Sequence, residues 1–455
     1  MTNLLSISSV LSTALSIVLA LVILLIMITV HELGHYLVGK LFKFKINEFA
    51  IGMGPAIYKK KHKNSDEVFS IRALPLGGYC AFEGEDEDND AEGAFNKKEP
   101  YKRILVLLAG ATMNLILGVI ILMISIGAYG QLLIQTYDVR PDSSPEYAGY
   151  SLQNDDVILK IEGKNIFLSS DILSALDGKS KGDVVSVTVN SNGTVKERKV
   201  RLRNDVNVKN LADSFSAFTA LGVSTIEKIS SQNAELNGGY LLRIDNADNY
   251  DNCSRIFSVN DLTEYAKSRS VGETISFYYS TTGSDKKHYS VTLTEDLALK
   301  QDGEILSILG IDGTTTLLKY STKNVKFSFG ETIERGFYYS ISIGGTIFRT
   351  LGELLTGKLG LNAMGGTITT ISVTAEAIKL GGFNYFLEIA GFIGINLAVF
   401  NLLPIPALDG SRVVFCLIEW IRKKPVNRKV EGIIHTVGLL FLLGFSILVD
   451  LLQLF

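Results

Sequence analysis

His31, Glu32 and His35 lie at the end of an apolar run that starts near residue 15 and has no charged residue before them. On a helix, residues four apart are just over one turn apart, so both imidazoles project from one face and can bind one metal ion. Glu32 is then placed to take a proton from a metal-bound water. We expect Zn²⁺, because it makes such a water acidic enough at neutral pH to attack an amide carbonyl.

The H-E-x-x-H spacing also occurs by chance in long proteins, as part of an ordinary amphipathic helix. Here it ends an apolar segment long enough to span a bilayer, at whose centre each ionisable group costs roughly 2.5 to 3.5 kcal/mol. A charged trio in this position indicates function. Catalytic zinc generally has three protein ligands, so a third must come from elsewhere in the chain.

Asp409 is the candidate for the third ligand. It lies in NLLPIPALDG, residues 401–410, where two prolines break a helix. Such breaks are tolerated at membrane depth where protein or a cavity takes up the freed backbone groups. A carboxylate oxygen can complete a zinc site beside two histidines. The alternative is a plain turn aspartate. Asn396 and Asn401, on the preceding helix, could hold an extended substrate backbone or pack against other helices.

The composition indicates a membrane protein that also has water-soluble parts. The 455 residues leave room for two or three domains, and 47% of them are hydrophobic, with a mean hydropathy of +0.25. A net charge of -3 argues against nucleic acid as a partner. Three widely spaced cysteines predict no disulfide framework, and none is close to the motif in sequence. We expect His62, His288 and His435 to be incidental.

Four apolar segments, at about 7–30, 104–128, 385–399 and 433–455, are candidate transmembrane helices. Basic residues cluster after the first, before the second and after the third. By the positive-inside rule these sides are cytoplasmic and both termini lie outside. This orientation brings Asp409 and the H-E-x-x-H to the same, cytoplasmic, end of the bilayer.

Two regions between the apolar segments have strand-like patterns. Residues 44–100 contain two pieces with glycine pairs, which predict a hairpin or small sheet beside the motif; a cytosolic linker is the alternative. Residues 129 to about 325 contain no apolar span, and a helix-strand-turn-strand order occurs twice there, which indicates tandem domains. Residues 327–359 mix apolar and charged residues and predict an interfacial helix. The glycine pairs are Gly52, Gly54, Gly77 and Gly78.

Several of these motifs together resemble the site-2 protease family of intramembrane zinc metalloproteases. They are HELGH at 31–35, GMGP at 52–55, LPLGGY at 74–79 and NLLPIPALDG at 401–410. The stretch VRPDSSPEYAGYSLQNDDVILKIEGK at 139–164 has a PDZ-like pattern, which makes the chain similar to the bacterial RseP group. LLTGKLGLNAMGG at 354–366 resembles the segment before the third span in that group.

The resemblance implies a polytopic α-helical membrane protein with about four transmembrane helices, tandem PDZ-like α+β domains and a small membrane-associated β element. We expect transmembrane helices at 1–38, 104–128 and 433–455, and a third one with its cytoplasmic loop at 385–432. The remaining regions are the β hairpin at 39–103, the PDZ-like domains at 129–206 and 207–298, and a connector with an interfacial helix at 299–384.

The resemblance also implies roles for individual residues. His31, His35 and Asp409 would bind Zn²⁺, and Glu32 would activate the water. The substrates would be single-pass transmembrane proteins already trimmed outside the bacterial cytoplasmic membrane, such as anti-sigma factors, or remnant signal peptides. The PDZ-like domains would bind peptide or act as a size filter. Substrate contacts would come from Asn396, Asn401, Gly52, Gly54, Gly77 and Gly78, the glycine pieces pairing with an unwound substrate strand.

Two other functions are compatible with parts of the sequence. A catalytically silent membrane scaffold would use the PDZ-like domains to bind extracytoplasmic peptides, but it needs no charges at membrane depth. A transporter would use its buried carboxylates to relay protons, and removing metal would leave its activity intact. The intact trio together with Asp409 favours the protease.

Overall fold

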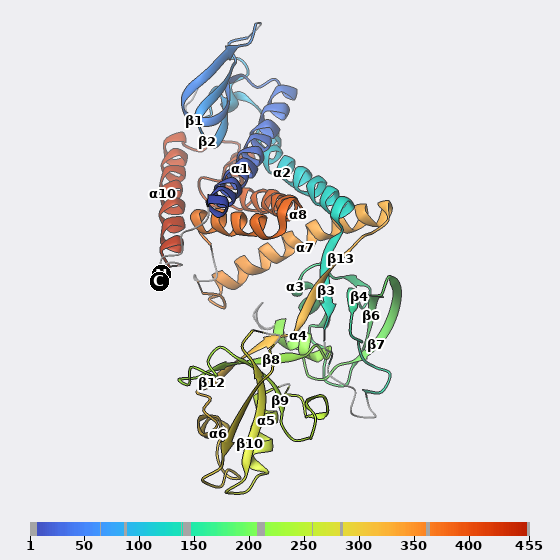
Figure 1. Ribbon diagram of the computed structural model, residues 1–455. Coiled ribbons are helices and arrows are strands. Elements are labelled where there is room, and N and C mark those ends of the chain that lie inside the picture. The colour runs from blue at the N-terminus through green and yellow to red at the C-terminus, as the bar shows by residue number, and fades with distance from the viewer. Residues whose placement is uncertain are drawn as a thin grey trace. The chain divides into compact units, whose positions relative to one another are not determined.

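The computed structural model describes residues 7–452 except 64, 86–88, 138, 140–146, 207–213, 257, 283–284 and 361–364. Parts of the stretches 139–164 and 354–366, which carry some of the family resemblance, are therefore outside the described residues. The chain forms two compact units, Met1–Gln131 with Val325–Phe455, and Leu132–Asn324. Helices dominate the first unit and strands the second (Figure 1).

Among its described residues, the first unit contains four segments long and apolar enough to cross a membrane, which confirms the predicted number. They are Ala14–Leu41, Pro100–Tyr129, Gly382–Asn401 and Lys429–Leu452. The helices of this unit are α1 (Ile7–Leu41), α2 (Pro100–Tyr129), α7 (Phe329–Leu355), α8 (Thr367–Asn401), α9 (Asp409–Arg422) and α10 (Arg428–Leu452).

Two of these helices are not among the candidate spans. The amphipathic α7 occupies the region expected to form an interfacial helix. The sequence after Asp409 was expected to be a cytoplasmic loop, but it forms the helix α9. Val413 and Cys416, three residues apart, share a face of α9 and belong to the apolar cluster that includes Val106 of α2. That apolar face explains why this polar segment is helical.

Because it holds the four candidate spans, the first unit is called the membrane unit. Helices α1, α2 and α8 pack together and form its core. Ile23 and Met27 of α1 are buried in one cluster with Ile393 of α8. Where α2 crosses α8, a Cβ atom added to Gly118 would lie 2.9 Å from the carbonyl oxygen of Gly391. Small residues at such crossings let two helix backbones approach closely in a membrane.

A bent β sheet follows α1 and consists of β1 (Ile46–Lys61) and β2 (Val68–Phe82). Residues 48–51 of β1 pair on one side with 68–71 and on the other with 78–81, while 68–71 also pair with 58–61. Three glycines with positive φ interrupt the ladder, at Gly52, Gly54 and Gly77. These interruptions bend both strands. As a result, segment 78–82 forms an edge of the sheet.

The second unit contains two mixed α/β modules. The first has a sheet in the order β13-β3-β4-β6-β7, with β5 paired to β4, and the second has the order β11-β10-β9-β8-β12. The first module's elements are β3 (Gln131–Thr136), β4 (Asp156–Ile161), β5 (Lys164–Asn165), α3 (Ser169–Leu176), β6 (Val184–Ser191), β7 (Thr194–Arg201), α4 (Ser214–Ala220) and β13 (Tyr320–Val325). The second's are β8 (Thr225–Ser230), β9 (Tyr240–Ile244), α5 (Val259–Lys267), β10 (Thr274–Ser280), β11 (Lys287–Thr292), α6 (Asp302–Ile308) and β12 (Gly313–Leu318).

Both modules extend past residue 298, where the sequence analysis placed the start of a connector. Strand β12 pairs with β8, and β13 joins the sheet of the first module next to β3. Their sequences, GTTTLL and YSTKNV, are short and polar. They are stabilised by pairing with strands far away in the chain, so local patterning does not identify them.

The ion pair between the buried Arg103 of α2 and the half-buried Glu419 of α9 provides a test of the packing in the membrane unit. Arg103 is 1% exposed, and its Nη2 donates to Glu419 Oε1 at 2.5 Å. We expect Glu419→Ala to destabilise the protein by about 3 kcal/mol, because it leaves a buried charge without its partner. The measurement is the melting temperature of the purified protein in detergent. Asp90→Ala, which removes an exposed partner of Lys97, is the control and should leave the melting temperature unchanged.

Candidate active site

The two imidazoles of the H-E-x-x-H motif converge near the end of α1. His31 and His35 are both buried, and their Nε2 atoms are 3.1 Å apart. His35 Nδ1 lies 2.8 Å from the carbonyl oxygen of Val106 on α2 and donates its proton to it. This bond fixes the tautomer of His35, so its Nε2 carries the free lone pair, as in most metal-binding histidines.

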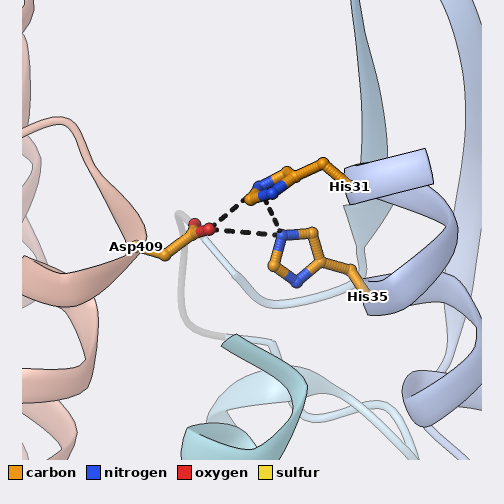
Figure 2. Close-up of side chains that lie close together, drawn as sticks. All are labelled: His31, His35 and Asp409. Atoms are coloured by element: carbon orange, nitrogen blue, oxygen red, sulfur yellow. Dashed lines mark hydrogen bonds and ion pairs between the residues drawn. The ribbon is translucent and has the colours of Figure 1, made fainter. Parts of the chain in front are cut away.

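Asp409 points at these imidazoles from the first turn of α9 (Figure 2). Its Oδ2 lies 3.0 Å from His31 Nε2 and 3.4 Å from His35 Nε2. The helix N-terminus favours a carboxylate at this position.

The donor set fits a zinc ion. Two imidazole nitrogens and one carboxylate oxygen are ligands that catalytic zinc uses, with a fourth position left for water. Tetrahedral zinc with bonds of about 2.0 to 2.1 Å keeps its ligand atoms roughly 3.3 Å apart. The three donor atoms are 3.0 to 3.4 Å apart. Gathering buried lone pairs this closely is costly unless a cation binds between them.

Glu32 lies beside the three donors and is held by the β sheet. Its Oε2 accepts a hydrogen bond from the backbone N–H of Cys80 on β2, at 2.9 Å. Glu32, His35 and Asp409 line one cavity of about 380 Å³. A carboxylate beside a metal site, with one oxygen already fixed by a backbone donor, can accept a proton from water in the cavity.

The edge of β2 forms one wall of this cavity, which is lined by residues 79–82. The N–H groups of Cys80 and Phe82 point away from β1, because they donate to Glu32 and to Glu85 respectively. Along a strand, alternate residues direct their N–H and C=O groups to the same side. These two N–H groups are already bonded to the glutamates, so an extended peptide could pair with the backbone carbonyl groups on the same side of the strand.

The residues expected to contact substrate differ in how close they lie to the H-E-x-x-H motif and to the cavity. Gly78 is next to the motif: a Cβ atom added to it would lie 3.6 Å from Glu32 Cγ. Gly52, Gly54 and Gly77 are the positive-φ positions of the sheet. In the described part of the chain, the lining of the cavity includes neither Asn396 nor Asn401; both are half-buried on α8.

Sequence reasoning missed several residues near the site. His435 was expected to be incidental, but its Nδ1 accepts a hydrogen bond from the N–H of Ala407, two residues before Asp409. Cys80 is far from the motif in sequence, yet it lines the cavity. Glu85 and Arg412 also line it and form an ion pair. All of these contacts depend on tertiary structure, so no local sequence signal could have identified them.

Cys80 lines the cavity but does not belong to the group of donors that could share one metal ion. Burial, and then the nearby Glu32 carboxylate, raise the pKa of the Cys80 thiol well above its usual value. Among the described residues, His31, His35 and Asp409 form the group whose ligand atoms lie close enough together to share one metal ion.

A His-His-Asp cluster with a glutamate beside it, two of its members at the end of an apolar helix, is the kind of site expected in a membrane metallopeptidase. The comparisons with known proteins identify the family. Residues 19–445 match the model of peptidase family M50, so the chain belongs to this family, the site-2 proteases, and is a metalloprotease.

The chain is also similar over nearly its whole length to bacterial proteins. It is 28% identical to a Clostridium perfringens protein named as a candidate zinc metalloprotease, covering 93% of this chain and 94% of that one. It is 27% identical to a Thermotoga maritima protein with the same description, covering 91% and 94%. It is 27% identical to the Haemophilus influenzae regulator of sigma E protease, covering 92% and 94%.

Gly110 of α2 leaves the space that the imidazoles occupy. A Cβ atom added to it would lie 2.4 Å from His35 Nε2 and 2.7 Å from His31 Cε1. We expect Gly110→Ala to displace these rings and to weaken zinc binding at least 10-fold, measured by competition with a chelator. In Gly127→Ala, on the same helix, the added Cβ would lie 3.5 Å from the nearest atom, so this control should bind zinc normally. Unchanged zinc affinity in Gly110→Ala would contradict the placement of the site.

Proposed function

We propose that this metalloprotease is an intramembrane endopeptidase that cuts transmembrane segments of single-pass proteins after their outer domains have been trimmed. One observation carries the proposal. The His31, His35 and Asp409 donors meet within the membrane unit, with Glu32 beside them, and His31 and His35 are part of an apolar span. A peptidase site in that position suits substrates that are themselves within the bilayer.

Zn²⁺ is the cofactor, and we assign His31 Nε2, His35 Nε2 and an Asp409 carboxylate oxygen as its ligands. Bound zinc supplies Lewis acidity, which activates water as a nucleophile and polarises the scissile carbonyl. Val106 supports this set by fixing the ring of His35. Other known proteins similar to this chain carry zinc in their names.

Glu32 is the proposed general base. Its carboxylate takes a proton from the attacking water and then delivers it to the nitrogen of the leaving amine. The N–H of Cys80 holds one Glu32 oxygen, which leaves the other to receive the proton. The carboxylate thus needs little rearrangement during the reaction.

The substrate must unwind before it is cut, because a helix shields its carbonyl groups and already uses its N–H groups. Lipid cannot replace the lost hydrogen bonds. We propose that the cavity-facing edge at residues 78–82 replaces them by pairing with the unwound strand. Gly52, Gly54, Gly77 and Gly78 would allow the sheet to bend towards the substrate, and Asn396 and Asn401 would contact it from α8.

The proposed orientation puts the active site near the cytoplasmic face of a bacterial cytoplasmic membrane. Both termini and the two mixed modules of the second unit, called the β modules, would lie outside. The basic clusters support it: Lys40 to Lys63 from the last turn of α1 onwards, Lys97 to Arg103 at the start of α2, and Arg412 to Lys429 around α9. The modules are PDZ-like in element order, and we propose that they act as a size filter. Anti-sigma factors and remnant signal peptides are the proposed substrate types.

Replacing the general base tests this function. We expect Glu32→Gln to abolish cleavage of a tagged single-span substrate in co-expressing membranes, since an amide cannot take the proton, while zinc content stays at the wild-type level. Cleavage is followed by immunoblot, and zinc by elemental analysis of the purified proteins. If wild type leaves the substrate intact and holds no zinc, the chain is better described as a scaffold, and ligands of the β modules become the question.

Removing the β modules tests the size filter. The chain leaves and re-enters the membrane unit at adjacent points: a Cβ atom on Gly130 would lie 2.8 Å from the carbonyl oxygen of Val325. Joining Gln131 to Val325 therefore closes a short gap. We expect this deletion to retain cleavage of trimmed substrates and to gain cleavage of untrimmed ones, measured as the ratio of the two rates. The same deletion with Glu32→Gln is the control. An unchanged ratio would exclude the filter.

A further inference from the structure

Helix α10 contacts the loop before Asp409 at two points, both at the peptide unit that joins Pro406 to Ala407. His435 Nδ1 accepts a hydrogen bond from the N–H of Ala407 at 3.1 Å. Three residues further along α10, a Cβ atom added to Gly438 would lie 2.3 Å from Pro406 Cβ and 2.8 Å from the Pro406 carbonyl oxygen. Residues three apart share one face of a helix, so both contacts come from the same side of α10.

We propose that His435 is a positioning residue for the metal ligand Asp409, acting through the backbone N–H of Ala407, and that Gly438 supports the same peptide. This inference rests on the proposed role of Asp409 as a ligand. His435 lies outside the motifs found in the sequence and on a different helix, α10, from all three proposed ligands.

The backbone between Ala407 and Asp409 explains how a contact at one position controls the other. Ala407 has φ of 78°, a conformation that costs energy for any residue with a Cβ and persists where the surroundings hold it. Beyond it, Leu408 N–H donates to Ile405 O, and Ser411 donates to Leu408 O through both its N–H and its hydroxyl. A rotation at Ala407 would therefore swing the start of α9 and the carboxylate that it carries.

The imidazole of His435 is itself well placed for this role. A peptide N–H can only donate, so Nδ1 must accept and the ring proton resides on Nε2. The ring packs edge-on against Phe415 of α9, with the centroids 5.7 Å apart. His435 thus lies between the loop and the helix that begins with Asp409. Metal ligands are commonly oriented by such outer partners, and losing one typically weakens metal affinity by about 10- to 100-fold.

Zinc affinity of the full-length protein in detergent, measured by chelator competition, tests the proposal without relying on activity. We expect His435→Ala to weaken zinc binding about 10-fold or more. His435→Asn should restore most of the affinity, because its Oδ1 can accept the same hydrogen bond. Thr436→Val, at the next position of α10, is the control and should bind zinc as wild type does.

The second contact gives an independent variant that keeps the test decisive if His435→Ala does not fold. Gly438→Ala should displace Pro406 and weaken zinc binding. Gly444→Ala is its matched control, because nothing lies within 4 Å of a Cβ added there. Wild-type affinity in both His435→Ala and Gly438→Ala would overturn the proposal, as would His435→Asn binding zinc no better than His435→Ala.

Asp409→Ala separates this inference from the function on which it rests. If Asp409→Ala weakens zinc binding but the α10 variants do not, the positioning role fails and the ligand assignment stands. If Asp409→Ala binds zinc with wild-type affinity, the ligand assignment itself fails, and the positioning role fails with it.

Discussion

The structure depends on bringing two imidazoles and a carboxylate to one buried point. Each group prefers water, and placing three lone pairs within 3.4 Å of one another costs free energy that a bound cation would offset. Much of the membrane unit serves this convergence. Gly110 lets α2 approach the rings of α1, Val106 fixes His35, and the loop after α8 turns so that α9 begins with Asp409.

A second requirement is a polar, hydrogen-bonding surface inside the membrane unit, where an unwound peptide could be held. The bent β sheet supplies it. Glycines with positive φ interrupt the β1–β2 ladder, and the edge at residues 78–82 faces the cavity. The same edge orients Glu32 through Cys80, so one strand connects proposed substrate binding to proton transfer. In this proposal its backbone groups, more than its side chains, would perform both roles.

The sequence predicts the parts of the site that follow local rules. His31 and His35 follow from helical spacing, the four spans follow from hydropathy, and the prolines before Asp409 mark a helix break. Such rules do not predict contacts made through the backbone. The N–H of Ala407 donates a hydrogen bond to His435, and the N–H of Cys80 donates one to Glu32. Strands β12 and β13 were not predicted for a similar reason: their partner strands are distant in the chain, and their own hydrophobic patterns are weak.

The ligand set is the central claim, and X-ray absorption at the zinc edge of the purified full-length protein tests it most directly. Our account predicts a shell of nitrogen and oxygen at about 2.0 to 2.1 Å, with the scattering signature of two imidazoles and no sulfur. A zinc–sulfur distance of about 2.3 Å would contradict it by placing a cysteine, such as Cys80 of the same cavity, on the metal. A spectrum without two imidazoles would contradict it as well.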